Sequence, residues 1–368
     1  MRDSIVMPRH KTRKVMVGDV AVGGDAPIAV QSMTNTLTTD IDATVAQIKR
    51  LESAGADIVR VSVPDSESAA AMPEILNQTD VPIIADIHFS YKMALASLDA
   101  GVHGLRLNPG NIGGRDRVER VVKAAKERGT SIRIGVNAGS LEKELNEKYG
   151  EPCADAMVES AMNHIRILED MDFHDIKVSL KASNIPMTVA AYRKLAGKVD
   201  YPLHLGITES GSLFGGTVKS SIGLGLLLAD GIGDTIRVSL AAKPEEEIKV
   251  GFEILKSLGL RHRGVNLIAC PSCARQKFDV IDAVAELERR VAHIQENIDV
   301  AVIGCVVNGP GEAKEVALGV TGGYPTHTLY ADGEKFGKIS SGKMIDHLVE
   351  DIEQRAAVIR ESKGTSDG

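Results

Sequence analysis

Tryptophan is absent from this 368-residue chain, and aromatic residues make up only 3% of it. Proteins that bind single-stranded nucleic acid by base stacking depend on aromatic side chains, so this class is disfavoured. Basic residues are not in excess either, because the formal net charge is −7. This balance argues against a nucleic-acid partner, although it leaves room for a local basic pocket.

Long apolar runs are also missing. No stretch approaches the ~20 apolar residues of a membrane span, and the first residues, MRDSIVMPRHKTRKVMVGD, lack the apolar core of a signal peptide. We therefore expect a cytoplasmic protein with no membrane partner. The 4 cysteines are too few for a disulfide scaffold, so those that cluster are interpreted first as metal ligands or redox groups.

In the first two-thirds of the chain, β-rich runs alternate with amphipathic helical segments, several of which end in glycine. This alternation is typical of a parallel sheet with helical crossovers. Eight units over about 250 residues predict an α/β fold, a (β/α)8 TIM-type barrel at 1–258, with a doubly wound open sheet as the alternative. The expected strands are 29–33, 58–63, 83–87, 104–107, 131–136, 176–180, 203–207 and 235–240.

A different pattern follows, which predicts a smaller α+β domain at 264–361 and a disordered tail at 362–368. Glycine and proline in NGPGE predict a loop at 308–312, and Asp332-Gly333 predicts the turn of a hairpin. The other elements expected are strands at 264–270 and 300–307, helices at 276–297 and 341–361, and the hairpin at 329–339.

Three of the cysteines form a candidate metal centre. Cys270 and Cys273 enclose Pro-Ser on one turn, and Cys305 follows at the end of the next expected strand. Thiolates are ligands of iron–sulfur clusters and of zinc. Glu312, at the end of NGPGE, could supply an exchangeable fourth ligand. Structural zinc and a redox dithiol remain alternatives, whereas Cys153 is interpreted as a small buried hydrophobe.

Strands of a parallel barrel are normally apolar along their whole length, yet here polar residues recur at alternate positions, which share one face. Repetition on successive strands would bring these side chains together at the carboxyl-terminal mouth, where barrel active sites lie. The residues concerned are Arg60 and Ser62, Asp86 and His88, Arg106 and Asn108, Arg133 and Asn137, Lys177, Ser179 and Lys181, Thr208 and Glu209, and Arg237 and Ser239.

Such a mouth would be strongly cationic inside an acidic protein. Arginine offers planar donors suited to phosphate, so the expected ligand is a compact polyanion such as a diphosphate. Asp86, His88 and Glu209 are the acid–base candidates, because a buried carboxyl can stay protonated and donate a proton. The alternative for Asp86 is that it only neutralises a neighbouring arginine.

Several stretches together resemble the bacterial 4-hydroxy-3-methylbut-2-en-1-yl diphosphate synthases over residues 4–360. These are CPSC, VIGCVVNGPGE and the strand ends RVSVP, ADIHF, LRLNPGN and RIGVN. The chain lacks the large middle insertion of plant-type relatives. The resemblance implies two-electron reductive ring opening and dehydration of 2-C-methyl-D-erythritol 2,4-cyclodiphosphate to 4-hydroxy-3-methylbut-2-enyl diphosphate, in isoprenoid biosynthesis.

The resemblance also implies residue roles and partners. A [4Fe-4S] cluster would bind Cys270, Cys273, Cys305 and Glu312, with Glu312 also catalytic. Flavodoxin or ferredoxin would supply electrons to a homodimer in which the cluster domain of one chain covers the barrel of the other. Proton transfer would fall to Glu209 and Asp86, with His88 beside them. The diphosphate would contact Arg60, Arg106, Arg133, Lys181 and Arg237, with hydrogen bonds from Asn108, Asn137 and Ser239.

Two other functions are compatible with parts of the pattern. A phosphosugar lyase with a structural zinc would be colourless and would not need Glu312. An iron-responsive regulator would tolerate loss of the barrel arginines, and the cationic strand ends argue against it.

Overall fold

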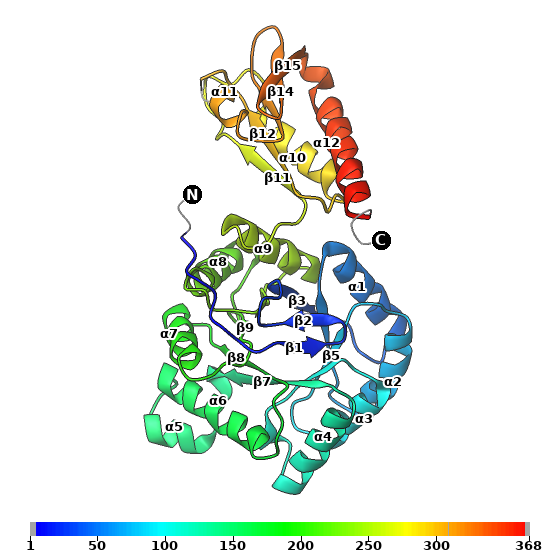
Figure 1. Cartoon of the computed structure of the whole chain (residues 1–368), viewed down its shortest axis with the longest axis vertical. Helices are drawn as coiled ribbons and strands as arrows, with labels where there is room; N and C mark the ends of the chain where they lie inside the picture. Colours follow the sequence, from blue (N-terminus) through cyan, green and yellow to red (C-terminus); the bar gives the residue numbers. More distant parts are fainter. Residues whose placement is uncertain (1–4, 308, 365–368) are drawn as a thin grey trace. The chain divides into compact units, whose positions relative to one another are not determined.

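The computed structural model describes residues 5–307 and 309–364. The chain divides into two compact units, Met1–Arg261 and His262–Gly368 (Figure 1). Within the described residues, none of the helices combines the length and the apolar content that a membrane crossing requires.

The first unit is a closed parallel barrel, which confirms the predicted (β/α)8 fold and excludes the open sheet (Figure 1). Its strands pair in the order β8-β7-β6-β5-β4-β3-β10-β9, and a parallel bridge between Val178 and Leu203 closes the ring. The strands are β3 (Ala29–Met33), β4 (Ile58–Ser62), β5 (Ile83–Asp86), β6 (Gly104–Arg106), β7 (Ser131–Asn137), β8 (Ile176–Lys181), β9 (His204–Leu205) and β10 (Thr235–Ile236). Each lies where the sequence predicted a strand.

Helices follow the strands, and local signals set their ends. Asp40 accepts a hydrogen bond from the backbone of Ala43 at the start of α1, and Gly55 ends this helix with φ 107°. The barrel helices are α1 (Ile41–Ala54), α2 (Ser66–Asn77), α3 (Tyr91–Ala100), α4 (Arg115–Glu127), α5 (Lys143–Tyr149), α6 (Ala154–Glu169), α7 (Ile185–Ala196), α8 (Leu213–Ala229) and α9 (Pro244–Ser257).

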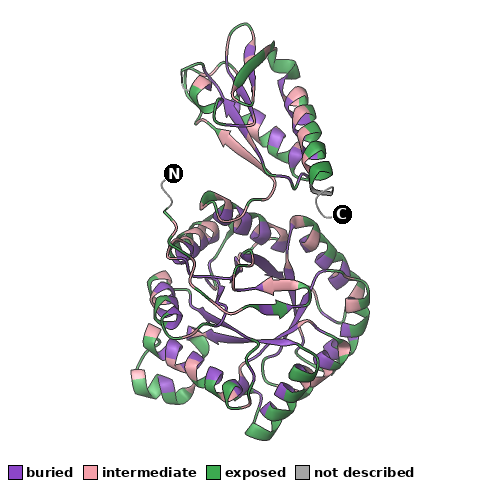
Figure 2. Cartoon of the chain, in the orientation of Figure 1, coloured by how far each residue is buried: buried purple, intermediate pink, exposed green. Residues whose placement is uncertain are grey.

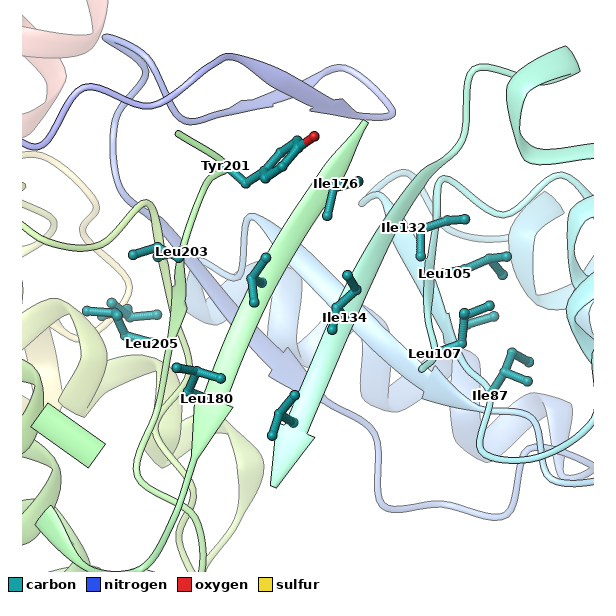
Figure 3. Close-up of a cluster of buried hydrophobic side chains, with 14 of the residues drawn as sticks. Ile87, Leu105, Leu107, Ile132, Ile134, Ile176, Leu180, Tyr201, Leu203 and Leu205 are labelled. Atoms are coloured by element: carbon teal, nitrogen blue, oxygen red, sulfur yellow. The ribbon is translucent and has the colours of Figure 1, made fainter. Parts of the chain in front are cut away.

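Alternation along the strands separates two environments. On β7, Ile132 and Ile134 belong to the apolar layer between strands and helices (Figure 3), and the strands are largely buried (Figure 2). The alternate residues Ser131 and Arg133 are equally buried but polar, so they face the barrel interior. The barrel therefore has an apolar outer layer and a polar centre.

A hairpin that the sequence did not predict closes the amino-terminal end of the barrel, which we call the floor. It consists of β1 (Val15–Val17) and β2 (Val20–Val22). Val17 and Val22 pack against Ala29, Ile58 and Ile84, which lie at or near the starts of strands. The floor is therefore sealed by apolar packing, and the opposite end, the mouth, is left for ligands.

The second unit has a mixed sheet, as expected for an α+β domain. Its first three strands are parallel and the last two antiparallel, in sequence order. Leu287 from α10 and Leu348 and Ile352 from α12 pack with Val300 and Val320 of the sheet. The elements are β11 (Val265–Ala269), α10 (Val280–Val291), β12 (Ile298–Ile303), α11 (Gly309–Glu312), β13 (Leu318–Thr321), β14 (His327–Ala331), β15 (Glu334–Ile339) and α12 (Ser341–Gly364).

Several local expectations for this unit need correction. The NGPGE segment is not all loop, because Gly309–Glu312 forms one helical turn; Asn308 lies outside the described residues. The turn at Asp332-Gly333 is confirmed, with φ values of 48° and 84°. The last helix continues to Gly364, so 362–364 of the expected tail are helical, and 365–368 lie outside the described residues.

Candidate active site

A cluster of buried cations occupies the mouth half of the barrel interior. Each comes from a different strand or strand end, as the alternating pattern predicted. Burial lowers the pKa of Lys181, and the charges of the neighbouring arginines lower it further. The members of this cation cluster are Arg60, Arg106, Arg133, Lys181 and Arg237.

Asp86, at the end of β5, is a carboxylate that pairs with two members of this cluster. Its Oδ2 lies 3.5 Å from Nε of Arg60, and its Oδ1 lies 3.4 Å from Nη1 of Arg106. Burial alone would raise the pKa of Asp86, but the charges of Arg60, Arg106, His88 and Arg133 together hold it below the ordinary value. Asp86 is therefore ionised at neutral pH, which favours a neutralising role over that of proton donor.

Arg106 and Asn108 are both fixed to the backbone of Gly135 on the next strand. Nη2 of Arg106 and Nδ2 of Asn108 donate to the carbonyl oxygen of Gly135, at 2.9 and 3.1 Å. The amide of Gly135 donates in return to Oδ1 of Asn108, at 2.8 Å. The two side chains are thus held without a ligand, which limits the entropy lost on binding.

Two glycines provide the space that long cationic side chains need. A Cβ at Gly135 would lie 2.5 Å from Nε of Arg106. A Cβ at Gly206 would lie 2.9 Å from Nζ of Lys181. Neither glycine needs a positive φ, so their role is to admit a neighbouring charge rather than to allow a turn.

The cluster contains more positive charge than its carboxylates neutralise. Nη1 of Arg133 donates to Oγ of Ser179 at 2.6 Å, whereas its Nε and Nη2 are buried without a partner among the described residues. Burial lowers the pKa of Arg133 well below its ordinary value, and the charges of Arg60 and Arg106 lower it further. Burial likewise lowers the pKa of Lys181. An anion bound here would gain unpaired donors and relieve this repulsion.

Glu247 belongs to the site, although sequence reasoning missed it. It lies in the first turn of α9, yet its carboxylate accepts hydrogen bonds from Oγ of Ser32 (2.9 Å) and the amide of Leu240 (3.0 Å). It also lies 3.9 Å from Nε of Arg237. Burial, then the charge of Arg60, lowers the pKa of Arg237 to about 10, and Glu247 opposes this shift. An acidic residue on the buried face of α9 was the signal that could have identified it.

The remaining predicted residues lie nearer the rim of the mouth. Glu209, just beyond β9, is exposed and has φ 53°, a left-handed conformation uncommon outside glycine. His88 is exposed, with its ring centroid 6.1 Å from that of Phe89. Asn137 and Ser239, at strand ends, are partly buried. The strand positions bring these residues to one end of the barrel, whereas Asp86 is paired directly with Arg60 and Arg106.

A lysine with a lowered pKa is buried in the barrel interior, nearer the floor than the cation cluster. Nζ of Lys177 donates to Oγ of Ser131 at 2.9 Å, and the side chain is fully buried. Burial, reinforced by the charge of Arg133, lowers the pKa of Lys177 to about 7. This lysine is therefore partly neutral near physiological pH and should make folding stability depend on pH.

The three candidate cysteine ligands lie on two adjacent loops of the second unit. Because β11 and β12 are parallel neighbours, their carboxyl ends lead into Cys270 and Cys305 at the same edge of the sheet. The amide of Gly304 donates to Sγ of Cys270 at 3.2 Å. Among the described residues, Cys270, Cys273 and Cys305 form no disulfide, and Glu312 lies at the end of α11.

The three thiols and the carboxylate of Glu312 are chemically suited to hold an iron–sulfur cluster. Within the described residues, no three Cys, His, Asp or Glu side chains are close enough to hold a single metal ion. Thiolates are the usual ligands of iron–sulfur clusters. The amide of Gly304 donates a hydrogen bond to Sγ of Cys270. Hydrogen bonds to ligand sulfurs adjust the reduction potential of an iron–sulfur cluster.

The fold and the site together define a class: a (β/α)8-barrel protein with a buried cationic mouth for a compact polyanion, followed by a thiol-bearing α+β domain. Comparison with known proteins narrows this class. The family model described as the GcpE TIM-barrel domain matches residues 12–252, and the model of the GcpE protein C-terminal domain matches residues 266–354. The chain therefore belongs to the GcpE family, which confirms the resemblance drawn from its motifs.

Curated relatives are similar in sequence to this chain over almost its full length. One from Magnetococcus marinus is 63% identical over 360 residues, covering 98% of this chain and 97% of the relative. One from Zymomonas mobilis is 60% identical over 356 residues, covering 96% and 94%. Both carry the name 4-hydroxy-3-methylbut-2-en-1-yl diphosphate synthase (flavodoxin).

Proposed function

We propose that this protein is a 4-hydroxy-3-methylbut-2-en-1-yl diphosphate synthase of isoprenoid biosynthesis. The reaction adds two electrons to 2-C-methyl-D-erythritol 2,4-cyclodiphosphate, opens its ring and releases water, giving 4-hydroxy-3-methylbut-2-enyl diphosphate. The observation that carries this proposal is the buried cation cluster, whose unpaired donors suit a diphosphate. The names of relatives at 60% identity or more support it.

The cation cluster binds the diphosphate. Arg133, whose Nε and Nη2 have no partner among the described residues, is the central donor. Arg106 and Asn108 are already held in place by Gly135, so they bind without further ordering. The binding set is Arg60, Arg106, Arg133, Lys181 and Arg237, with hydrogen bonds added by Asn108, Asn137 and Ser239.

Proton transfer is assigned to Glu209. The lowered pKa of Asp86 makes this carboxylate a permanent counter-ion of Arg60 and Arg106, so it orients the arginines rather than donating a proton. Glu209 is exposed at the rim, and its left-handed backbone conformation is held although it is unfavourable. His88, on the rim loop that follows β5, can assist by exchanging protons with solvent.

Cys270, Cys273, Cys305 and Glu312 would hold a [4Fe-4S] cluster, which supplies the electrons when bound. Flavodoxin is the proposed donor, because the relatives carry it in their names; ferredoxin is the alternative. As a carboxylate, Glu312 would be a weaker ligand than the three thiolates. It is exposed, on a helical turn of four residues.

The cluster domain of one chain acts on the barrel of another. Arg261 pairs with both carboxylate oxygens of Asp57, at 2.6 and 2.8 Å, and donates to the carbonyl of Ile28 just before β3. The chain therefore leaves the barrel at its floor, opposite the mouth.

Exposed apolar side chains support such a contact on both units. Leu37, Phe89 and Phe214, on loops or helix starts after β3, β5 and β9, are 77%, 76% and 83% exposed. In the second unit, Val307 and Tyr324 are 62% and 91% exposed, close in sequence to Cys305 and to the Gly322 loop that abuts it. Apolar groups at these positions would exclude water around reacting groups once covered.

The proposal is tested by product formation. Protein purified and reconstituted without oxygen is mixed with the cyclodiphosphate and reduced flavodoxin, and the phosphorus resonances are followed by NMR. We expect the cyclic substrate to be replaced by the linear diphosphate, at a rate that Arg133→Ala lowers by at least about 100-fold. Unchanged substrate, in a sample shown to hold iron and sulfide, would contradict the proposed activity.

A further inference from the structure

A buried histidine of α6 contacts the loop that carries Asn108. Nδ1 of His164 accepts a hydrogen bond from the amide of Gly110 at 3.3 Å. Gly110 belongs to η1 (Pro109–Asn111), a single 3-10 turn that begins directly after Asn108. The amide of Asn111 donates to the carbonyl of Asn108 at 2.9 Å and closes this turn. A constraint on Gly110 is therefore transmitted to Asn108.

The other nitrogen of the imidazole faces a carboxylate on the next loop of the mouth. Nε2 of His164 lies 2.7 Å from Oε1 of Glu142, which also accepts a hydrogen bond from Oγ of Ser160 at 2.9 Å. Glu142 follows η2 (Ala138–Ser140), the turn that begins directly after Asn137. Helix α6 therefore contacts both of the loops that carry the asparagines of the proposed diphosphate site.

These two contacts determine which nitrogen of His164 carries the proton. A backbone amide only donates, so Nδ1 must be unprotonated to accept from Gly110. The proton of the neutral ring is then on Nε2, where it faces Glu142. The contact with His164 is also the main cause that lowers the pKa of Glu142 to about 2. This carboxylate is therefore ionised at neutral pH and holds the ring in one tautomer.

Gly110 leaves the space that the imidazole needs. A Cβ built at Gly110 would lie 2.9 Å from Cε1 and 3.4 Å from Nδ1 of His164. His164 is only 3% exposed, so the ring has little room to retreat. The backbone of Gly110 does not have a positive φ. The close approach of the ring, rather than the conformation of the turn, therefore accounts for glycine at this position.

We propose that His164 is a positioning residue of the diphosphate site, which holds Gly110, and through it Asn108, where the diphosphate binds. The inference rests on the proposed function and deepens it. Asn108 is then held at two points: its side chain is bonded to Gly135, and its backbone is fixed through η1 to His164. A loop that is ordered before binding loses less entropy when the ligand arrives. His164 acts on affinity through Asn108 rather than by contact with the ligand.

Two conservative variants separate the two contacts of the ring. Asparagine places Oδ1 near the position of Nδ1, so His164→Asn keeps an acceptor for the amide of Gly110. Glutamine places its amide nitrogen near the position of Nε2, so His164→Gln keeps a donor toward Glu142 and leaves the Gly110 amide without its acceptor. Asparagine is the smaller of the two, so a role in packing alone would make His164→Asn the worse variant.

The test is the binding of inorganic diphosphate to the full-length protein, measured by isothermal titration calorimetry. We expect His164→Gln to raise the dissociation constant by about tenfold, because the loop must be ordered on binding. His164→Asn should stay within about threefold of wild type, because the hydrogen bond is kept. In steady-state assays the loss should appear in KM rather than in kcat, as for an interaction that binds substrate and transition state equally. Hydrogen–deuterium exchange at the Gly110 amide should be faster in His164→Gln than in His164→Asn.

Gly110→Ala tests the same contact with the helix unchanged. Its Cβ should displace the ring and weaken diphosphate binding by about tenfold as well. Two controls should bind like wild type. Gly139→Ala adds a Cβ that meets nothing within 4 Å on the neighbouring loop, and His174→Gln makes the same exchange at the floor, just before β8.

Wild-type affinity in His164→Gln, or a greater loss in His164→Asn than in His164→Gln, would overturn the positioning role. If the His164 variants do not fold, wild-type affinity in Gly110→Ala would overturn it instead. Product formation is measured separately on the same samples. A protein that shows the expected differences in diphosphate binding but makes no product would refute the proposed activity and leave the positioning role standing.

Discussion

Gly135→Ala should damage the site without damaging the fold. The added Cβ would lie 2.5 Å from Nε and 2.9 Å from Nη2 of Arg106. Ordinary contacts are about 3.5 Å, so the guanidinium must retreat by roughly 1 Å. Retreat disturbs its bond to the Gly135 carbonyl and its pairing with Asp86. A displacement of ~1 Å at a positioned group can lower the rate by ~100-fold.

The loss of activity in Gly135→Ala can be distinguished from a loss of stability. The backbone at Gly135 is extended rather than left-handed, so alanine fits the strand and by itself should stabilise it by roughly 0.4–1 kcal/mol. We expect kcat/KM for the cyclodiphosphate to fall by about 100-fold, or ~2.7 kcal/mol, with the melting temperature within a few degrees of wild type.

Gly139→Ala is the matched control, because a Cβ there meets nothing within 4 Å and the position follows the same strand. It should keep wild-type kcat/KM. A Gly135→Ala enzyme with kcat/KM within twofold of wild type would refute the proposal that Arg106 needs the space beside Gly135.

Three further predictions follow from individual side chains. Glu247→Gln removes the carboxylate beside Arg237 and should raise KM by about tenfold or more with less effect on kcat; an unchanged KM in steady-state assays would refute this positioning role. For Lys177, burial lowers the folded pKa to about 7 from 10.5. The unfolded state therefore binds more protons between these values, and this lysine makes the free energy of unfolding rise with pH in that window. Lys177→Met should remove that part of the rise in denaturant titrations, and a variant with the same slope as wild type would show that Lys177 is not the cause. Glu312→Ala should keep some bound iron yet lose most turnover, whereas full activity would remove Glu312 from the mechanism.

The barrel could be predicted because its signals are local and repeated. Each strand is a short run of mostly apolar residues in the sequence. Capping residues such as Asp40 and glycines such as Gly55 mark the helix ends. The floor hairpin was missed because each strand has only three residues, Val15–Val17 and Val20–Val22, too few to show periodicity. Its position depends on packing against the barrel strands rather than on its own sequence.

The helical turn at Gly309–Glu312 was missed for a different reason. Glycine and proline usually mark loops, but proline also suits the first turn of a helix, where its fixed φ is favourable and its missing amide costs nothing. The amide of Ala313 donates to the carbonyl of Gly309 at 2.9 Å and completes the turn. Local composition therefore gave the wrong prediction, because proline is compatible with a short helical turn as well as with a loop.

The strand pattern predicted which side chains gather at the mouth, but not how they interact. The protonation of Asp86 depends on the positions of Arg60 and Arg106, 3.5 and 3.4 Å away, and the sequence contains no such distances. Glu247 is 215 residues from Ser32 along the chain, so only barrel closure brings them together. Charge balance at the site is thus a property of the tertiary structure.

The central claim is that this barrel enzyme works through an iron–sulfur cluster on Cys270, Cys273, Cys305 and Glu312 rather than through a structural zinc. The most direct measurement is the iron, sulfide and zinc content of protein purified without oxygen. We expect about four iron and four sulfide per chain. Stoichiometric zinc without sulfide, persisting after attempted cluster reconstitution, would contradict it.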